Sequence, residues 1–527
     1  MALVHALEKA NVAFVPCHDQ SAAAITAATE GSIHRRPGAC LASRGPGATR
    51  LATGLATATH DGYPLVALVA GPHQEREHLP HQQHMDLERF LRPVTKATYK
   101  VCHPAAIPDL VREACRTAFA EKPGAVAVIV PENVLTGPAP ADAAPLEPHK
   151  PGVPVADPRL LRQAAARLDG AERPVILAGH GVVRAGAHEQ LQVLADKASI
   201  PVVTTYMGKA AIPWAHQMYA GSLGREAPDH ADALLRMADV VLAAGYCAGE
   251  FAPAMWHRDG ATVIHLGLQP AHVEACYNPA IELVGCIRKS LGSLAELCRP
   301  QRRADSQHDG LAGEVRAALA KEMEAAQREG TTPLTPQRVV MALSRALREP
   351  DVLCVDVGAH QEWACRLFPL KRAGTFWTSH AFAAMGFALP AAIGCALGLE
   401  AGHRCVALMG DGGWLASAAE VETAVRAQVP VSVVVLCDGC YGQQAAEAQA
   451  RYGSAAGTRF APPDVAAHAR ALGAKVHTAE SPDDLEAALL GAAQGREVVV
   501  IAVPVTTKYN QSLAEGVPDP VDRRAPV

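Results

Sequence analysis

Two aspartates each follow an apolar, β-branched run in the segment RCVALMGDGGWLASAAEVETAVRAQVPVSVVVLCDG, which reads as strand, turn, helix and strand. Asp411 and Asp438 are 27 residues apart, with one helical pattern between them. A right-handed crossover makes the two strands parallel, so that their ends lie side by side if the strands are neighbours. Two carboxylates there could share Mg²⁺, which prefers oxygen ligands and readily accepts phosphate oxygens. Gly412 and Gly413 would let the backbone approach a diphosphate at the helix N-terminus.

The elements that must position these residues recur along the whole chain. Short apolar runs alternate with helical patterns, at 125–130, 174–179, 238–245, 261–267, 351–358, 404–410 and 431–437. Such alternation predicts parallel sheets covered on both faces, with ligands beyond the carboxyl ends of the strands. Linkers at 136–158 and 300–336, the second including an exposed connecting helix, separate three blocks. The fold class is therefore α/β, with three doubly wound domains at 1–140, 155–300 and 335–510.

Composition excludes several classes of function. The 527 residues carry a formal net charge of −5 with no basic block, which argues against nucleic acid as a partner. No apolar run reaches the roughly 18 residues of a membrane span. The N-terminus does not resemble a signal peptide, so a cytoplasmic location is expected. The 14 cysteines are dispersed, and Cys437 and Cys440 have no second Cys or His pair nearby to complete a zinc site.

The segment around the two aspartates resembles the cofactor-binding motif of thiamine diphosphate (ThDP) enzymes: GDG, then ExxTAVR, then a strand ending in two polar residues. Most members end that motif with Asn-Asn, and the ending Cys437-Asp438 is more similar to the Asn-Asp of acetolactate synthases. The resemblance implies that Mg²⁺ is bound by Asp411, Asp438 and the main-chain carbonyl of Cys440.

Further segments extend this resemblance over nearly the whole chain. CVDVGAHQEW implies that Gly358 and His360 lie near the diphosphate, and TSHAFAAMGFALP implies a ring-binding loop. In that loop Met385 would lie between the two cofactor rings, and the carbonyl of Ala383 would accept from the aminopyrimidine. The middle block resembles the central domain of acetolactate synthases, which binds FAD in some members. The GHG at 179–181 is too short to predict a dinucleotide site, so FAD remains uncertain.

The first block resembles the pyrimidine-binding domain, with Gly-Pro-Gly-Ala-Thr at 45–49 and a substrate-side Gln83. Asp19 stands where the family motif His-Glu-x-x-Ala has its glutamate, the acid that activates the cofactor's pyrimidine ring. It is the same kind of acid on a stem one methylene shorter, and it must lie within hydrogen-bond reach of its partner. Arg50 stands where members usually carry Asn. Members also carry a strand and a Gly-Pro-Gly turn ahead of the present start, so we expect either an upstream start or a sheet lacking one strand.

The resemblance implies decarboxylation of a 2-oxo acid such as pyruvate and carboligation to 2-acetolactate, as in branched-chain amino acid biosynthesis. It also implies a homodimer or homotetramer, because ThDP in this family lies between two chains. One alternative is another ThDP-dependent decarboxylase or carboligase. A second alternative is a ThDP-binding homologue that has lost turnover, which Asp19, Arg50 and the short N-terminus favour.

Overall fold

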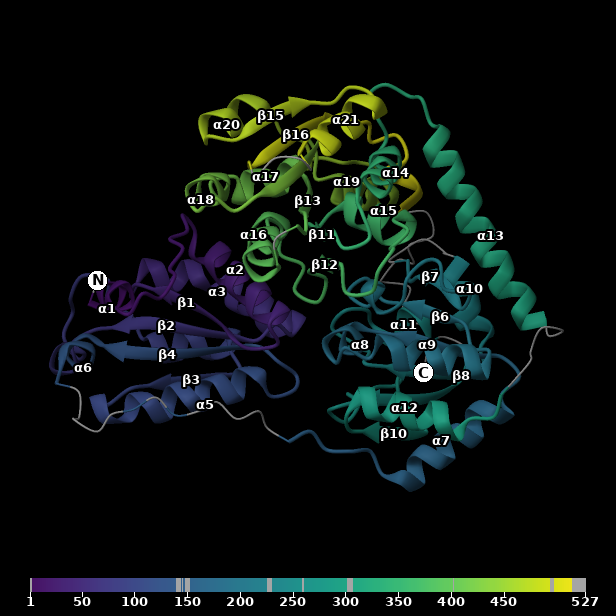
Figure 1. Cartoon of the computed structure of the whole chain (residues 1–527), viewed down its shortest axis with the longest axis horizontal. Helices are drawn as coiled ribbons and strands as arrows, with labels where there is room; N and C mark the ends of the chain where they lie inside the picture. The colour runs from purple at the N-terminus through teal and green to yellow at the C-terminus, as the bar shows by residue number, and fades with distance from the viewer. Residues whose placement is uncertain are drawn as a thin grey trace.

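A computed structural model describes residues 2–138, 144, 146, 152–224, 230–257, 260–300, 307–400, 402–492 and 497–513. Three sheets carry all of its named strands, and every strand pair in them is parallel. Figure 1 shows the three sheets with their helices as an N-terminal, a central and a C-terminal domain. The predicted α/β class and its three parallel-sheet domains are confirmed. Within the described residues, no helix is both long and apolar enough to cross a bilayer.

The N-terminal domain has a four-stranded sheet in the order β1-β2-β4-β3. Its strands are β1 (Gly38–Ala42), β2 (Leu65–Gly71), β3 (Ala97–Lys100) and β4 (Ala125–Pro131). Its helices are α1 (Ala2–Lys9), α2 (Gln20–Ile33), α3 (Pro46–Asp61), α4 (Leu87–Leu91), α5 (Ile107–Phe119) and α6 (Glu132–Thr136), with 3-10 turns η1 (Gln74–Arg76), η2 (Arg92–Val94) and η3 (Pro104–Ala106).

The segment before α2 reads as a strand but is not one. Residues 12–17, VAFVPC, belong to no sheet in the structure, and β1 at the sheet edge pairs only with β2. Val12 and Phe14 are 50% and 42% exposed. A β-branched, apolar segment becomes a strand only where a neighbour offers backbone donors and acceptors.

The central domain has a six-stranded sheet in the order β10-β9-β8-β5-β6-β7. Its strands are β5 (Pro174–Ala178), β6 (Val202–Thr204), β7 (Tyr219–Ser222), β8 (Val240–Ala244), β9 (Thr262–Gly267) and β10 (Ile281–Val284). Its helices are α7 (Pro158–Gly170), α8 (His180–Arg184), α9 (His188–Ala198), α10 (His230–Met237), α11 (Pro253–Trp256) and α12 (Ile287–Leu297), with the 3-10 turn η4 (Lys209–Ala211).

The C-terminal domain has a six-stranded sheet in the order β12-β11-β13-β14-β16-β15. Its strands are β11 (Val352–Val355), β12 (Phe376–Thr378), β13 (Cys405–Gly410), β14 (Val431–Cys437), β15 (Lys475–Thr478) and β16 (Val499–Pro504). Its helices are α14 (Pro336–Ala346), α15 (Ala359–Leu367), α16 (Ala388–Gly398), α17 (Asp411–Ser417), α18 (Glu420–Arg426), α19 (Gly442–Tyr452), α20 (Val465–Ala471) and α21 (Pro482–Ala492), with the 3-10 turn η5 (Asn510–Leu513). Two short helices, α17 and α18, therefore make the crossover where the sequence predicted one.

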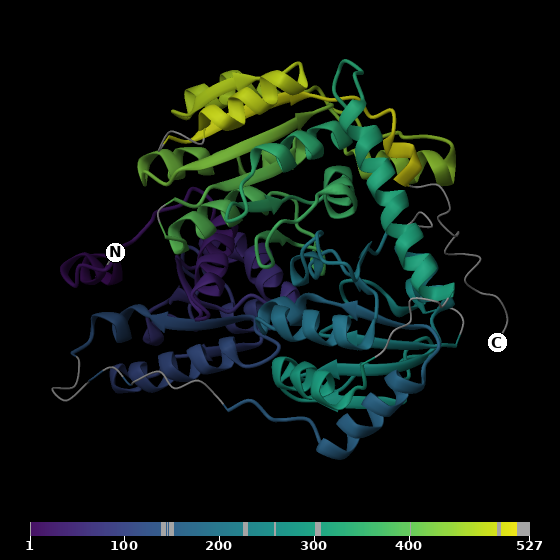
Figure 2. The same cartoon turned by 45° about the vertical axis from the view of Figure 1, so that its right-hand side comes forward.

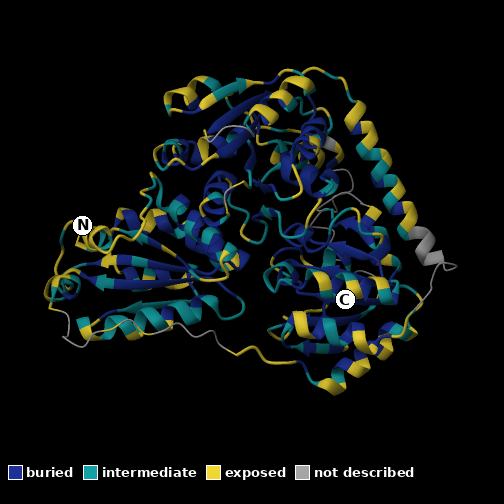
Figure 3. Ribbon diagram, in the orientation of Figure 1, coloured by how far each residue is buried: buried dark blue, intermediate teal, exposed yellow. Residues whose placement is uncertain are grey.

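The connecting helix α13 (Gln307–Arg328) runs along the outside of the molecule from the central to the C-terminal domain (Figure 2). The sequence predicted it as exposed, and its outer face is exposed, as Figure 3 shows. Its inner face buries Val315, Leu319 and Ala326. An apolar stripe at this spacing is what a helix needs in order to pack along one side.

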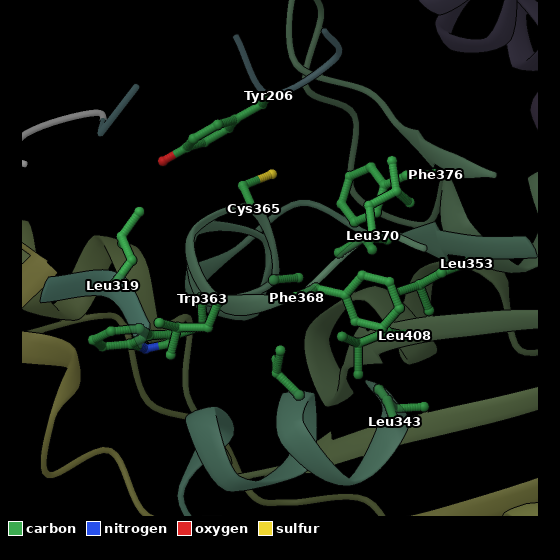
Figure 4. Packing of buried hydrophobic residues seen from close by; sticks show 14 of the residues in the cluster. Tyr206, Leu319, Leu343, Leu353, Trp363, Cys365, Phe368, Leu370, Phe376 and Leu408 are labelled. Carbon is green, nitrogen blue, oxygen red and sulfur yellow. The ribbon is translucent and has the colours of Figure 1, made fainter. Parts of the chain in front are cut away.

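The C-terminal domain shares its core with both of the others. One apolar cluster joins Tyr206 of the central domain to Trp363 and Phe376 of the C-terminal domain (Figure 4). Another joins the N-terminal domain to the C-terminal one, where α2 packs against α16. There the Thr26 hydroxyl donates to the carbonyl of Pro390 at 3.0 Å. The shared cores fix the positions of the strand ends that carry the candidate site.

Candidate functional site

Asp411 and Asp438 each follow a strand, as the sequence predicted, and the structure shows that the two strands are neighbours. β13 and β14 pair in parallel with Gly410 opposite Leu436, so the residues that follow them lie at one edge of the sheet. The Asp411 Oδ2 atom accepts from the backbone N–H of Asp438 at 3.1 Å and of Gly439 at 2.7 Å. Asp411 thus ties the two strand ends together through one of its two oxygens.

The other oxygen of Asp411 suits a cation. Its Oδ1 atom is buried and has no hydrogen-bond partner within the part of the chain that the structure describes. Burial raises the pKa of Asp411, and burial together with the nearby charge of Asp411 raises the pKa of Asp438 to about 7. Two buried carboxylates repel each other when both are ionised, and a divalent cation between them removes that cost.

Among the described residues, no three or more His, Cys, Asp or Glu side chains lie together so that they alone could hold a metal ion. A cation at this edge would therefore need main-chain or cofactor oxygens in addition to the two aspartates. Cys440 lies beside them, and its backbone N–H donates to Asp438 Oδ1 at 3.0 Å. Cys437 and Cys440 are both free thiols.

A partly open cavity with an empty volume of about 480 Å³ lies beside this pair. It brings together seven of the residues that the sequence singled out, from four separate segments of the C-terminal domain. These are Gly358, His360, Met385, Gly412, Gly413, Asp438 and Cys440. Gly410, which precedes Asp411 at the end of β13, also lines the cavity.

His360 contributes an unused polar atom to this cavity. The ring is 7% exposed, and its Nε2 atom is buried without a hydrogen-bond partner among the described residues. Burial lowers the pKa of His360 to about 4, so the ring is neutral near pH 7. An anion at Nε2 would raise that pKa by stabilising the protonated ring. Gly358, with φ at 145°, lets the chain enter α15 where a Cβ would touch the imidazole.

Asp356 is a site residue that the sequence analysis missed. Its buried carboxylate accepts from the backbone N–H of Val357 at 2.8 Å, Gly386 at 3.0 Å and Phe387 at 3.2 Å. It therefore fixes the loop that carries Ala383, at φ 57°, and the 39% exposed Met385. An aspartate directly after the β11 strand was the available signal.

The two glycines after Asp411 have a packing reason in addition to the one predicted. A Cβ on Gly413 would lie 2.5 Å from Asp356 Oδ2, and that buried carboxylate is held by backbone N–H groups. A Cβ on Gly412 would lie 2.8 Å from the Tyr441 ring. In the central domain, a Cβ on Gly179 or on Gly181 would lie 2.5 or 2.6 Å from Gly245, so those glycines serve close packing between the ends of β5 and β8.

Asp19 and Gln83 do not line this cavity, and lie instead on the N-terminal domain. Asp19 caps α2, with its Oδ1 accepting from the backbone N–H of Ser21 at 2.8 Å and Ala22 at 3.2 Å. Gln83, at φ 62°, packs so closely on Gly45 that a Cβ there would lie 2.7 Å from the Gln83 Cβ. Asp19 Oδ2 also lies 4.0 Å from Arg50 on α3, the helix that Gly45 begins, so both residues lie near the end of β1. We call this part of the N-terminal domain, with Asp19 and Gln83, the acid edge.

A buried glutamate of the C-terminal domain holds the acid edge. Glu420, 1% exposed, accepts through Oε1 from the backbone N–H of His18 at 3.1 Å and of Asp19 at 2.8 Å. Its Oε2 accepts from the Thr423 hydroxyl at 2.7 Å. The helix α18, which carries the ExxTAVR part of the cofactor-binding motif, thus fixes the backbone of Asp19.

Comparison with known proteins gives the same three-part division. The chain matches the models for the N-terminal TPP binding domain (residues 1–90), the central domain (161–294) and the C-terminal TPP binding domain (356–503) of thiamine pyrophosphate enzymes, thiamine pyrophosphate being another name for ThDP. It is 31% identical to the catabolic acetolactate synthase of Raoultella terrigena over 95% of this chain and 90% of that relative. It is 31% identical to the acetolactate synthase of Bacillus subtilis strain 168 over 94% and 87%.

A third relative, the acetolactate synthase isozyme 1 large subunit of Escherichia coli K12, is 28% identical over 81% of this chain and 74% of its own. The likeness is thus spread over all three domains, and the cavity beside Asp411 and Asp438 falls within the C-terminal TPP binding domain. The chain therefore belongs to the ThDP-dependent enzymes of the acetolactate synthase family.

Proposed function

We propose that the protein decarboxylates pyruvate and joins the remaining two-carbon unit to a second pyruvate, giving 2-acetolactate, with ThDP and Mg²⁺ as cofactors. The observation that carries this proposal is the pair of strand-end carboxylates beside a cavity with two unused polar atoms, Asp411 Oδ1 and His360 Nε2. An oxygen without a donor suits Mg²⁺. The relatives are acetolactate synthases, which supports acetolactate as the product.

The residues divide by the part of the cofactor that each would hold. Asp411, Asp438 and the Cys440 carbonyl would bind Mg²⁺. The diphosphate would lie against Gly358, His360, Gly412 and Gly413. Ala383 and Met385 would support the rings, on the loop that Asp356 fixes through three backbone bonds.

When bound, ThDP supplies the carbon nucleophile that adds to the 2-oxo acid and takes up the electron pair left by CO₂. Asp19 would hold and move the proton that activates the pyrimidine ring. Both capping bonds of Asp19 engage Oδ1, which leaves Oδ2 for proton exchange. Gln83, beside Gly45 on the same edge, would orient the substrate.

The two groups of residues lie in different domains, and the structure does not bring Asp19 or Gln83 into the Asp411 cavity of the same chain. A site made from both groups would then take its acid edge from a second copy, as in a homodimer or homotetramer. We expect light scattering at micromolar concentration to give at least twice the 55.2 kDa chain mass. A monomer that still turns over substrate would contradict this proposal.

Product analysis tests the reaction. With pyruvate, ThDP and Mg²⁺, we expect release of CO₂ together with 2-acetolactate. Free acetaldehyde in its place would identify a simple decarboxylase, and tight ThDP binding without CO₂ release would identify a homologue that has lost turnover. Either result would replace the proposed reaction.

Glu420 offers a test of how the acid is positioned. Glu420→Ala leaves the part-buried N–H groups of His18 and Asp19 without this acceptor, at up to about 1–3 kcal/mol for each. Because a shift near 1 Å can cost on the order of 10²-fold in rate, we expect kcat to fall roughly 10- to 100-fold. Glu420→Gln keeps the accepting oxygen, and its amide can donate to Thr423, so we expect it to restore most of the rate.

The matched control is Glu422→Ala, two residues along the same helix. Glu422 contacts the His18 side chain at 2.7 Å and leaves the backbone of Asp19 untouched. Exposed pairs of this kind contribute little, so kcat should stay close to wild type. Equal losses in both alanine variants would mean that Glu420 has no special part in holding Asp19.

A further inference from the structure

A buried aspartate of the N-terminal domain binds the loop at 379–387 of the C-terminal domain, which we call the ring-binding loop. Asp61 is the last residue of α3 and is 1% exposed. Its Oδ1 atom accepts from the backbone N–H of Ala381 at 3.0 Å and of Phe382 at 3.1 Å. Burial raises the pKa of the Asp61 carboxyl to about 6, so the group is largely ionised at pH 7. Hydrogen bonds to an ionised acceptor are the stronger kind, so Asp61 holds the loop firmly from another domain.

The ring-binding loop needs this support because of the backbone of Ala383. Its φ of 57° lies in the left-handed region, which an alanine rarely adopts. Such a conformation persists only where the surrounding structure holds it. On its C-terminal side the loop is held by Asp356, through the N–H groups of Gly386 and Phe387. On its N-terminal side it is held by Asp61, so the residues proposed to contact the cofactor rings lie between two buried carboxylates.

Asp61 is itself held by the central domain. Its main-chain carbonyl accepts from Nδ1 of His180 at 2.9 Å. His180 is 6% exposed, and burial lowers the pKa of its imidazole well below the usual value, so the ring is neutral near pH 7. A carbonyl can only accept, so Nδ1 carries the proton of that neutral ring. The GHG segment at 179–181 therefore anchors Asp61, and all three domains meet at this one aspartate.

We propose that Asp61 is a positioning residue, which fixes the ring-binding loop in the conformation that the rings of bound ThDP need. This inference rests on the proposed function, because that function gives Ala383 and Met385 their part in supporting the rings. Asp61 does not line the cavity beside Asp411, so it acts on that site only through the loop. Its contribution is the placement of the loop backbone, and a misplacement near 1 Å can cost on the order of 10²-fold in rate.

The first test measures the loop in the protein without cofactor, by hydrogen-exchange mass spectrometry. Asp61→Ala removes the acceptor from the N–H groups of Ala381 and Phe382. Their deuterium uptake, in peptides that cover the ring-binding loop, should become roughly 10- to 100-fold faster. Asp61→Asn keeps the accepting oxygen and loses only the charge, so its uptake should lie close to wild type. An unchanged uptake rate in Asp61→Ala would overturn the proposal, whatever the activity of the protein.

The second test measures the effect of the loop on the cofactor. In the protein loaded with ThDP and Mg²⁺, H/D exchange at C2 of bound ThDP should be about 10- to 100-fold slower in Asp61→Ala. The kcat on pyruvate should fall with it, and KM should stay near wild type, because the loop carries no residue proposed to bind the substrate. Asp61→Asn should restore most of both rates. Faster uptake in the loop with C2 exchange at the wild-type rate would also overturn the proposal.

Tyr63→Phe is the matched control. The Tyr63 hydroxyl donates to the carbonyl of Thr378 at 3.1 Å, so it joins the same two domains at the end of β12 without contacting the N–H groups that Asp61 binds. Whatever its effect on the melting temperature, this variant should leave loop uptake and C2 exchange at their wild-type rates. If it slows C2 exchange as much as Asp61→Ala does, the contact between the domains in general is responsible, and the proposal is wrong.

Two further points keep the result clear. If Asp61→Ala does not fold, Asp61→Ser takes its place with the same expectations, because a serine hydroxyl is too short to reach both N–H groups of the loop. Exchange at C2 needs no 2-oxo acid, so it separates this inference from the proposed reaction. If C2 exchange depends on Asp61 while pyruvate gives no 2-acetolactate, the proposed reaction fails and the positioning role of Asp61 stands.

Discussion

Asp411→Ala is expected to abolish the retention of ThDP in the presence of Mg²⁺. The substitution removes two things at once: the unpartnered Oδ1 that would bind the cation, and the Oδ2 that holds the N–H groups of Asp438 and Gly439. Losing a group that only hydrogen-bonds to a metal ligand typically weakens metal binding by roughly 10- to 100-fold. Asp411→Ala would remove a metal ligand itself and the orientation of Asp438, so the loss of ThDP affinity should exceed that range. Calorimetry with ThDP at saturating Mg²⁺ measures the effect.

Two further variants sharpen that experiment. Asp411→Asn keeps an oxygen that can accept from Gly439 and loses the charge, so it should bind ThDP more weakly than wild type and better than Asp411→Ala. Asp464→Ala removes an exposed aspartate that caps α20 in the same domain, through a bond to the Ala467 N–H at 2.8 Å. It should leave ThDP affinity unchanged. Wild-type affinity in Asp411→Ala would mean that the cofactor site is elsewhere.

Asp19 is expected to give the second large effect, with Asp19→Ala and Asp19→Asn both almost inactive. An asparagine caps a helix as well as an aspartate does, whereas alanine costs about 0.5–2 kcal/mol at that position. Asp19→Asn should therefore keep the stability of α2 and lose only the acid. CO₂ release from pyruvate and H/D exchange at C2 of bound ThDP are the measurements.

Asp19→Glu should be as fast as wild type or faster. The aspartate stem is shorter than that of glutamate by one bond, about 1.5 Å. A misplacement near 1 Å can cost on the order of 10²-fold in rate, so the longer side chain should reach its partner better. If Asp19→Asn exchanges C2 as fast as wild type, Asp19 is not the activating acid.

Much of the C-terminal domain could be predicted because its signals are local. Runs such as VSVVVLC specify buried parallel strands, and a single crossover between Asp411 and Asp438 was enough to predict that β13 and β14 are parallel. That the two strands are also neighbours is a finding of the structure. The division of that crossover into α17 and α18 was not visible, because helix ends depend on packing that a short pattern does not encode.

The features that were missed depend on contacts between distant segments. Asp356, Asp411 and Asp438 all follow a strand, yet Asp356 fixes a loop thirty residues away while Asp411 accepts from the backbone N–H of Asp438. Neighbouring strands decide which task each carboxylate takes. Likewise, nothing near Glu420 in the sequence indicates that it accepts from Asp19, some 400 residues earlier. The segment 12–17 has a strand pattern, but the pattern cannot say whether a partner strand lies beside it.

The packing of α2 against α16 has a consequence for the birth of the chain on the ribosome. The apolar face of α2 is covered by a helix that emerges only after most of the protein has been made. At about 5–20 residues per second, the roughly 350 residues between the two helices take about 20–70 s to translate. Throughout that interval the nascent N-terminal domain exposes the surface around Thr26 that Pro390 will later meet. We expect chaperones that bind nascent chains to cover this surface until α16 emerges, and a slow codon run before α16 would lengthen the exposure.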